Sequence, residues 1–185
     1  QGIVPGIVEG GGAPAGYFTG ATGATVYTGD ALGEGFRDTV FIADVGSNLI
    51  HRKVLTEQGV LAVGKRVDEK GEFLASSDIW FRPVDMANGP DGALYVIDMS
   101  REVIEHPASL PPLIKKHLDL TSGREQGRIY RVVPQDFQQP KLVRLGDLSS
   151  AELVKYLAHP NGWTRETAAR LIFEREDASV AEGVR

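Results

Sequence analysis

Cysteine is absent from the 185-residue sequence. Disulfide bonds, thiolate metal sites and a covalently attached haem are therefore excluded within this stretch. No apolar run is long enough to cross a membrane, and the opening residues lack the basic-then-apolar layout of a signal peptide. Charged residues make up 24% of the chain and sum to a net charge of −5, so the composition predicts neither a nucleic-acid partner nor a membrane span.

An initiator methionine is also lacking. The sequence starts at Gln1, and the residues that follow are typical of an internal segment. We therefore expect a fragment of a longer polypeptide, whose targeting signal this stretch does not reveal. The 22 glycines and 10 prolines indicate many turns and favour short strands over long helices.

Short β-branched and aromatic runs, separated by glycine, aspartate and asparagine turns, predict β-strands from residue 16 to about residue 134. Two parts of this region repeat one another, since residues 41–44 match residues 95–98 and residues 49–52 match residues 128–131. In each copy one strand ends in aspartate, and the next strand carries an apolar–aromatic–arginine pattern. The period of about 50 residues is typical of a propeller blade.

A β-propeller closes its ring with roughly four to eight blades, and this repeat supplies about two. We therefore expect residues 1–140 to form the last blades of an incomplete β-propeller. The missing blades would belong to the same polypeptide. An open piece of this kind is expected to be inactive alone.

Helical spacing replaces the strand pattern after Pro140. Ser149 and Glu152 have the spacing of a capping box, and Thr164 is the predicted cap of a second helix with a buried stripe at Ala168, Leu171 and Ile172. Two short helices joined by a Pro-Asn-Gly turn are typical of one repeat of an α-solenoid. The predicted fold is therefore mainly β with an α-helical tail, in which residues 141–185 begin a HEAT-like solenoid whose further repeats are missing.

Five motifs carry a family resemblance: residues 16–23, 41–46, 87–95, 101–107 and 127–132. They resemble the large bacterial propeller-plus-HEAT proteins known as membrane-bound dehydrogenases or haem-binding proteins. The propeller of that family is similar to those of quinoprotein glucose and sorbosone dehydrogenases. The resemblance covers nearly the whole chain, and its most specific part runs from residue 81 to residue 133.

The resemblance implies a sugar or alcohol dehydrogenase, located in the periplasm or secreted, that uses pyrroloquinoline quinone with calcium. Its electrons would pass to a c-type haem in a missing C-terminal module. Two departures are visible. Ser100 stands where the family usually has tyrosine, and the Cys-x-x-Cys-His haem site does not occur in this stretch.

Candidate site residues lie mainly in an insertion between the strands of the second repeat, from Met99 to Gln126. Loops of this kind lie on one face of a propeller ring, where ligands gather. Because the quinone carries carboxylates, its site needs arginine or lysine, and its substrate needs a general base. The predicted site residues are Arg101, Arg124 and Arg128 for the cofactor and His106 or His117 for catalysis, with no metal ligand assigned.

Plainer roles are open for several of these residue types. Asp44 and Asp98, at strand ends, have the position of turn-forming residues that bind nearby backbone amides. Arg52 and Arg131 occupy equivalent repeat positions, which predicts structural ion pairs between blades.

Two other functions remain open from the sequence. The first is a non-catalytic propeller–HEAT scaffold that binds a glycan or a protein, favoured by the repeat architecture and by Ser100. The second is a calcium-dependent hydrolase of the lactonase kind, because propellers host several chemistries.

Overall fold

The computed structural model describes residues 18, 20–37, 39–104 and 106–184. These residues form two compact units, each assembled from three separate stretches of chain. The sheet unit draws on Gln1–Val26, Thr39–Met86 and Val96–Tyr130. The helical unit draws on Tyr27–Asp38, Ala87–Tyr95 and Arg131–Arg185, so two loops of the β region belong with the C-terminal helices.

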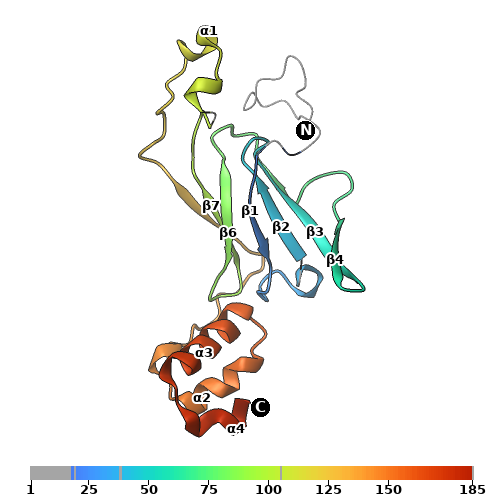
Figure 1. Ribbon diagram of the computed structural model, residues 1–185, viewed down its shortest axis with the longest axis vertical. Helices are drawn as coiled ribbons and strands as arrows, with labels where there is room; N and C mark the ends of the chain where they lie inside the picture. Colours follow the sequence, from blue (N-terminus) through green and yellow to red (C-terminus); the bar gives the residue numbers. More distant parts are fainter. Residues whose placement is uncertain (1–17, 19, 38, 105, 185) are drawn as a thin grey trace. The chain divides into compact units, whose positions relative to one another are not determined.

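The first sheet is an antiparallel meander in which each strand pairs with the next along the chain (Figure 1). A short fifth strand pairs with the third. Its strands are β1 (Ala21–Val26), β2 (Thr39–Asp44), β3 (Leu49–Gln58), β4 (Leu61–Arg66) and β5 (Leu74–Ala75). A two-residue turn joins β3 to β4, and its Gly59 has a φ of 63°, the left-handed conformation that such hairpins favour.

The second sheet has the order β6 (Pro83–Asn88), β7 (Leu94–Asp98) and β8 (Arg128–Val132). A long excursion separates β7 from β8. It contains a 3-10 turn, η2 (Pro107–Ser109), and one short helix, α1 (Pro112–Lys115). Mainly antiparallel β structure with a helical tail is therefore confirmed.

Both sheets of the sheet unit contribute buried apolar side chains. Phe41 and Ile50 are fully buried in the first sheet, and Val96 is fully buried in β7 of the second. The ring of Phe41 lies 4.5 Å from that of Phe73, measured between centroids. Buried and half-buried positions alternate along β2 from Thr39 to Ala43, as the two-residue period of a strand predicts.

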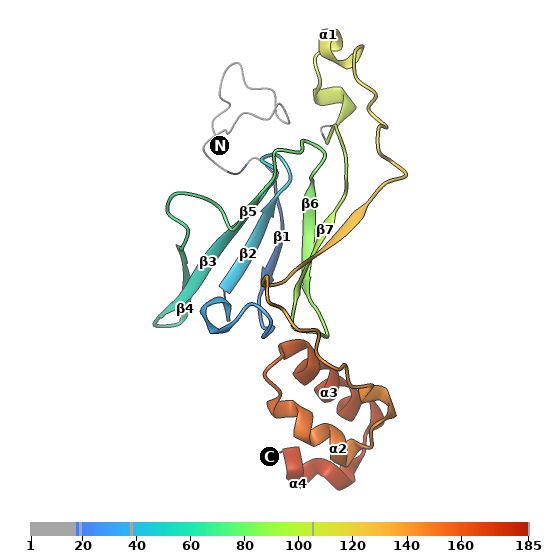
Figure 2. The ribbon, with the colours of Figure 1, turned by 180° about the vertical axis from the view of Figure 1, so that it is seen from behind.

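Strands β1 and β6 lie side by side in both views (Figures 1 and 2). The hydroxyl of Thr22 donates to the Pro83 carbonyl at 2.9 Å, and that of Thr25 donates to the Met86 carbonyl at 2.8 Å. Gly23 lies between these two threonines. A Cβ placed on Gly23 would come within 2.6 Å of the Asp85 Cα, so the close approach of the two backbones requires glycine.

We expect Gly23→Ala to lower the free energy of unfolding by about 1–3 kcal/mol because the added methyl group overlaps the β6 backbone. Chemical denaturation measures the change. Gly71→Ala is the matched control, since a Cβ there would meet no atom within 4 Å. With no overlap, replacing glycine by alanine stabilises a chain slightly through the unfolded state. Equal effects in the two variants would contradict the close approach.

The helical unit contains the tail of the chain. Its helices are α2 (Ser150–Val154), the 3-10 turn η4 (Lys155–Ala158), α3 (Gly162–Arg175) and α4 (Ala181–Val184). The predicted capping box is confirmed, because the Ser149 hydroxyl accepts from the Glu152 amide while the Glu152 carboxylate accepts from the Ser149 amide. The core consists of Leu145, Leu153 and Ala168, with Leu171 and Ile172 packed against it.

The second helix begins earlier than predicted. Its cap is Asn161 and not Thr164, because the Asn161 side chain accepts from the Trp163 amide at 3.0 Å. The same side chain donates to the carbonyls of Gly89 and Pro90, both at 3.0 Å. Asn161 therefore ties the start of α3 to a loop of the β region inside the helical unit. No helix among the described residues is long and apolar enough to span a membrane.

Candidate functional site

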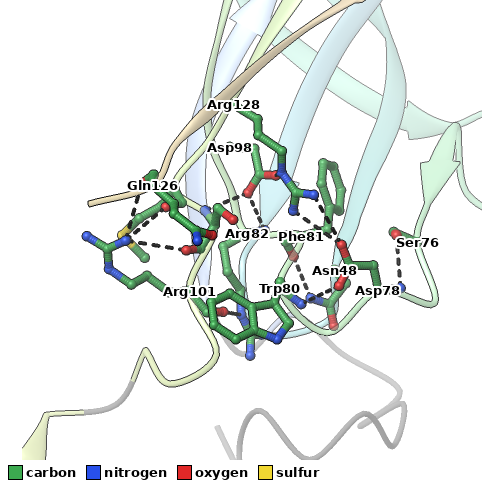
Figure 3. Close-up of polar contacts among 12 residues, drawn as sticks. Asn48, Ser76, Asp78, Trp80, Phe81, Arg82, Asp98, Arg101, Gln126 and Arg128 are labelled. Atoms are coloured by element: carbon green, nitrogen blue, oxygen red, sulfur yellow. Dashed lines mark hydrogen bonds and ion pairs between the residues drawn. The ribbon is translucent and has the colours of Figure 1, made fainter. Parts of the chain in front are cut away.

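Asp98, the last residue of β7, is the centre of a buried polar cluster (Figure 3). One carboxylate oxygen accepts from the backbone amides of Arg82 and Ser100, at 2.7 and 2.8 Å. The other oxygen accepts from Nε of Arg128 at 2.8 Å. The Asp98 side chain is fully buried, so these donors replace the water that a carboxylate otherwise needs.

Asp44, the last residue of β2, has an equivalent set of contacts. Its carboxylate accepts from the backbone amides of Gly20 and Gly46, each at 3.0 Å, and from the Ser47 hydroxyl at 3.0 Å. In both sheets the aspartate therefore binds the amide two residues ahead and the amide of the residue directly before the preceding strand. The expectation that both aspartates form turns is confirmed.

The backbone around the two aspartates repeats as well. The Val45 amide donates to the Gly20 carbonyl at 3.1 Å, and the Met99 amide donates to the Arg82 carbonyl at 2.9 Å. Gly20 thus corresponds to Arg82, and Val45 to Met99. The internal repeat predicted from the sequence is confirmed at these contacts, and we call each arrangement an aspartate latch.

Arg128, a predicted cofactor residue, bridges two carboxylates of unequal burial. It binds the buried Asp98 and also Asp78, whose side chain is 45% exposed, at 3.2 Å. Burial alone lowers the pKa of the Arg128 guanidinium, but attraction and hydrogen bonding to Asp98, followed by Asp78, outweigh it and raise the pKa. The guanidinium is therefore held as a cation between two anions.

Arg101, a second predicted cofactor residue, holds the root of the excursion together. One guanidinium nitrogen contacts the carbonyl of Gly123, and it lies 3.3 Å from each of the carbonyls of Met99, Ser100 and Gln126. Because these carbonyls come from both ends of the excursion, Arg101 joins its outgoing and returning chains.

Arg82 also binds the root of the excursion. Its side chain is fully buried, and its guanidinium donates to the carbonyls of Val45, Arg101 and Glu102 at 2.8–2.9 Å. The sequence analysis did not select Arg82 as functional. The only sequence signal that could have indicated a buried role is its position between Phe81 and Pro83, in a mainly apolar run.

The three remaining predicted site residues also belong to the excursion: His106 and His117 lie farther along it, and Arg124 lies between Gly123 and Gln126 at its root. Their side chains are exposed, and the structure does not bring them into one cluster with Arg101 and Arg128. Arg124 pairs with its neighbour Glu125 at 3.3 Å, with side chains 70% and 86% exposed, and its charge also helps to lower the pKa of Asp119. His106 caps η2, because its Nδ1 accepts from the Ala108 amide at 3.2 Å. His117 follows α1 and makes no side-chain hydrogen bond among the described residues.

Comparison with known proteins places the chain. A family model described as Domain of unknown function (DUF7133) matches residues 6–136. The chain belongs to this family. No curated protein and no solved structure matches it.

The predicted quinone cofactor would need cationic side chains of this DUF7133 chain that do not already bind other groups of the protein. Arg124 comes nearest to this requirement, since the two carboxylates that attract it, Glu125 and Asp119, are both exposed. Arg101 and Arg128 bind backbone carbonyls and buried carboxylates, so their first role is to hold the fold. The described residues contain no group of three histidine, aspartate or glutamate side chains able to hold a metal ion.

The recurrent arginines of the two repeats form ion pairs, but not between blades. Arg52 pairs with Asp68 at 3.1 Å, just after β4, and Arg131 pairs with Asp91 at 2.5 Å, in the turn between β6 and β7. Each partner therefore lies in or beside the arginine's own sheet, and the expectation of pairs between blades was wrong. The loop after β4 brings Asp68 to Arg52 in β3, and the loop after β6 brings Asp91 to Arg131 in β8.

His51, in β3, is a further buried polar residue. Its ring is buried, and its Nδ1 lies 2.6 Å from Oε2 of Glu72. The other oxygen of Glu72 pairs with Arg66 at 2.6 Å. No periodicity in the sequence relates these three residues, because they meet through the loop between β4 and β5.

Proposed function

We propose that this DUF7133 chain supplies blades of a β-propeller, and the start of a HEAT-like solenoid, to a quinoprotein-like sugar or alcohol dehydrogenase. The resemblance of residues 81–133 supports this assignment. The aspartate latch supports the propeller part, because the same contacts recur in two successive sheets, as copies of one blade would require. Other blades and a haem module would come from the rest of the intact protein.

The excursion between β7 and β8 carries the functional part of the proposal. Its root is fixed by Arg82 and Arg101. Arg124, which lies at this root beside Gly123, and His117, which lies farther along the excursion, are both exposed. A rigid base with exposed basic side chains is suited to present them at a ligand. Arg124 would bind a carboxylate of the quinone, for which arginine geometry is suited.

The two histidines differ in their readiness to act as a base. Because Nδ1 of His106 accepts a hydrogen bond, its neutral ring carries the proton on Nε2, and its outer nitrogen is a donor. The imidazole of His117 has no such constraint among the described contacts. We therefore assign the base to His117 and the capping of η2 to His106.

The reaction would remove two electrons and two protons from an alcohol. When bound, the quinone would supply the acceptor for the hydride and, in the end, for the proton that leaves the hydroxyl. His117 would accept the hydroxyl proton, so that the alcohol becomes a carbonyl compound. The electrons would then leave for the haem module, with calcium and substrate bound by residues outside the described part of the chain.

A non-catalytic scaffold is the second candidate function. The observation that favours it is the commitment of Arg101 and Arg128 to backbone carbonyls and buried carboxylates, which leaves fewer cations for a cofactor. A scaffold of this kind would retain the latches and would need neither His117 nor Arg124.

Cofactor titration of the intact protein separates the two candidates. We expect pyrroloquinoline quinone with calcium to bind and to support dye reduction with sugars, and His117→Ala to lower turnover by about tenfold or more. Leu113→Ala, an exposed change on the same excursion, is the control and should leave turnover unchanged. A folded, haem-loaded protein that neither binds the quinone nor oxidises any sugar would refute the dehydrogenase and favour the scaffold.

A further inference from the structure

The helical unit contains a groove of about 330 Å³ that is separate from the excursion in sequence. Its lining includes Tyr156 and Trp163, together with the segment 140–145. We call it the Trp163 groove. A volume of this size lies within the range of small-molecule sites, and a mainly apolar lining with a few polar groups is typical of them.

The groove carries no net charge. Two carboxylates and two cations line it, and half of these are already paired: Asp91 binds Arg131 at 2.5 Å, and Arg144 binds Asp147 at 3.0 Å. The remaining charges are Asp30 and Lys141, which have opposite signs. An ion of either sign would meet one attractive and one repulsive group, so the groove is suited to an uncharged ligand.

The polar atoms of the groove include both donors and acceptors. In the described part of the chain, the Asp30 carboxylate and the Lys141 ammonium group have no hydrogen-bond partner. The same is true there of the Tyr156 hydroxyl and the Trp163 indole N–H. His159 uses Nδ1 to accept from the Asn161 amide at 3.0 Å, so its Nε2 carries the proton of the neutral ring. A ligand that binds here should offer donors and acceptors in similar numbers.

We propose that the Trp163 groove binds a neutral saccharide. A sugar ring has apolar C–H faces that can pack on the rings of Tyr156 and Trp163, and its hydroxyl groups both donate and accept. Asp30 would accept from hydroxyls, and Lys141 would donate to them. This site is independent of the proposed dehydrogenase reaction, which concerns the excursion of the sheet unit.

The structure also explains why the groove is preformed. Asn161 binds the carbonyls of Gly89 and Pro90, and the Gly162 amide donates to the Thr28 carbonyl at 2.7 Å. These bonds fix the loop that carries Asp30 and the start of the helix that carries Trp163. Preorganisation of this kind lowers the entropy lost on binding.

Intrinsic fluorescence of the full 185-residue chain can test the proposal. The sequence contains two tryptophans, so Trp80→Phe leaves Trp163 as the only indole. We expect saturable changes with cellohexaose, maltohexaose or xylohexaose, and none with charged oligogalacturonide. Calorimetry should show that Asp30→Ala or Lys141→Ala weakens binding about tenfold, as loss of a charged hydrogen bond predicts.

Phe173→Ala is the matched control, because that side chain is 82% exposed on the same helix but does not line the groove. It should leave the affinity unchanged. A folded chain that binds none of the neutral oligosaccharides, or binds only the charged one, would overturn the proposal. So would binding that survives intact in Asp30→Ala, Lys141→Ala and Trp163→Phe. Binding without any oxidation by the intact protein would leave this inference standing while the dehydrogenase failed.

Discussion

Asp98→Ala is expected to lower the free energy of unfolding by about 3–5 kcal/mol, because two buried backbone amides lose their acceptor at a cost of about 1–3 kcal/mol each. The substitution removes the acceptor of two backbone amides, those of Arg82 and Ser100, and the anion that faces Arg128. Both amide donors belong to buried residues, so water cannot readily replace the carboxylate. Equilibrium denaturation by urea, followed by circular dichroism, measures the loss.

Asp78→Ala is the matched control, since Asp78 binds the same arginine from an exposed position. Its side chain is 45% exposed, against full burial for Asp98. Solvent screens an exposed pair, and we expect a loss of about 1 kcal/mol or less. If the two alanine variants were equally destabilised, the charge on Arg128 rather than the burial of Asp98 would govern stability, and the latch would lose its assigned role.

The sequence predicted the latch aspartates because they share two visible signals. Each aspartate is the last residue of an apolar strand, and each is followed by a turn. The two copies of the repeat could therefore be aligned from the sequence alone. The capping box at Ser149 was equally visible, since both of its partners lie within four residues. Local chemistry of this kind is written in the sequence at fixed spacings.

Contacts between distant residues were not visible in the same way. Arg82 binds Val45 and Glu102, which are 37 and 20 residues away along the chain. The partners of Arg52 and Arg131 were expected in another repeat for the same reason, because the paths of the loops decide which carboxylate returns to a strand. The cap of α3 was misplaced at Thr164 because Asn161 lies in a turn that the sequence pattern assigned to the loop.

The site residues show how structure changes a sequence hypothesis without deciding it. Arginine type and a position in the excursion pointed equally to Arg101, Arg124 and Arg128. The contacts separate them, since two of the three bind carbonyls or a buried carboxylate, whereas the carboxylates that attract Arg124 are exposed. A cofactor that needs a free cation would therefore meet Arg124 before the other two.

Arg82→Met is expected to cost about 3 kcal/mol or more, because it leaves three backbone carbonyls without their donor in a buried site. Methionine fills much of the volume but donates no hydrogen bond. Two of the carbonyls belong to Arg101 and Glu102, at the root of the excursion. Loss of these bonds should loosen the root, so limited trypsin digestion should cut at Lys115, Lys116 or Arg124 faster than in the unaltered chain.

Arg66→Ala is the control that tests whether the loss of stability in Arg82→Met depends on the burial of the arginine. Arg66 also donates to two backbone carbonyls, those of Asp68 and Gly71 at 2.6 and 2.7 Å, but its side chain is 46% exposed. Water can solvate those carbonyls after the substitution, and we expect a loss of about 1 kcal/mol or less and no faster digestion of the excursion. Arg82→Lys should resemble Arg82→Met, because a single ammonium group does not span carbonyls that a planar guanidinium reaches from three nitrogens. A stable Arg82→Lys variant with normal resistance to trypsin would show that charge alone holds the root.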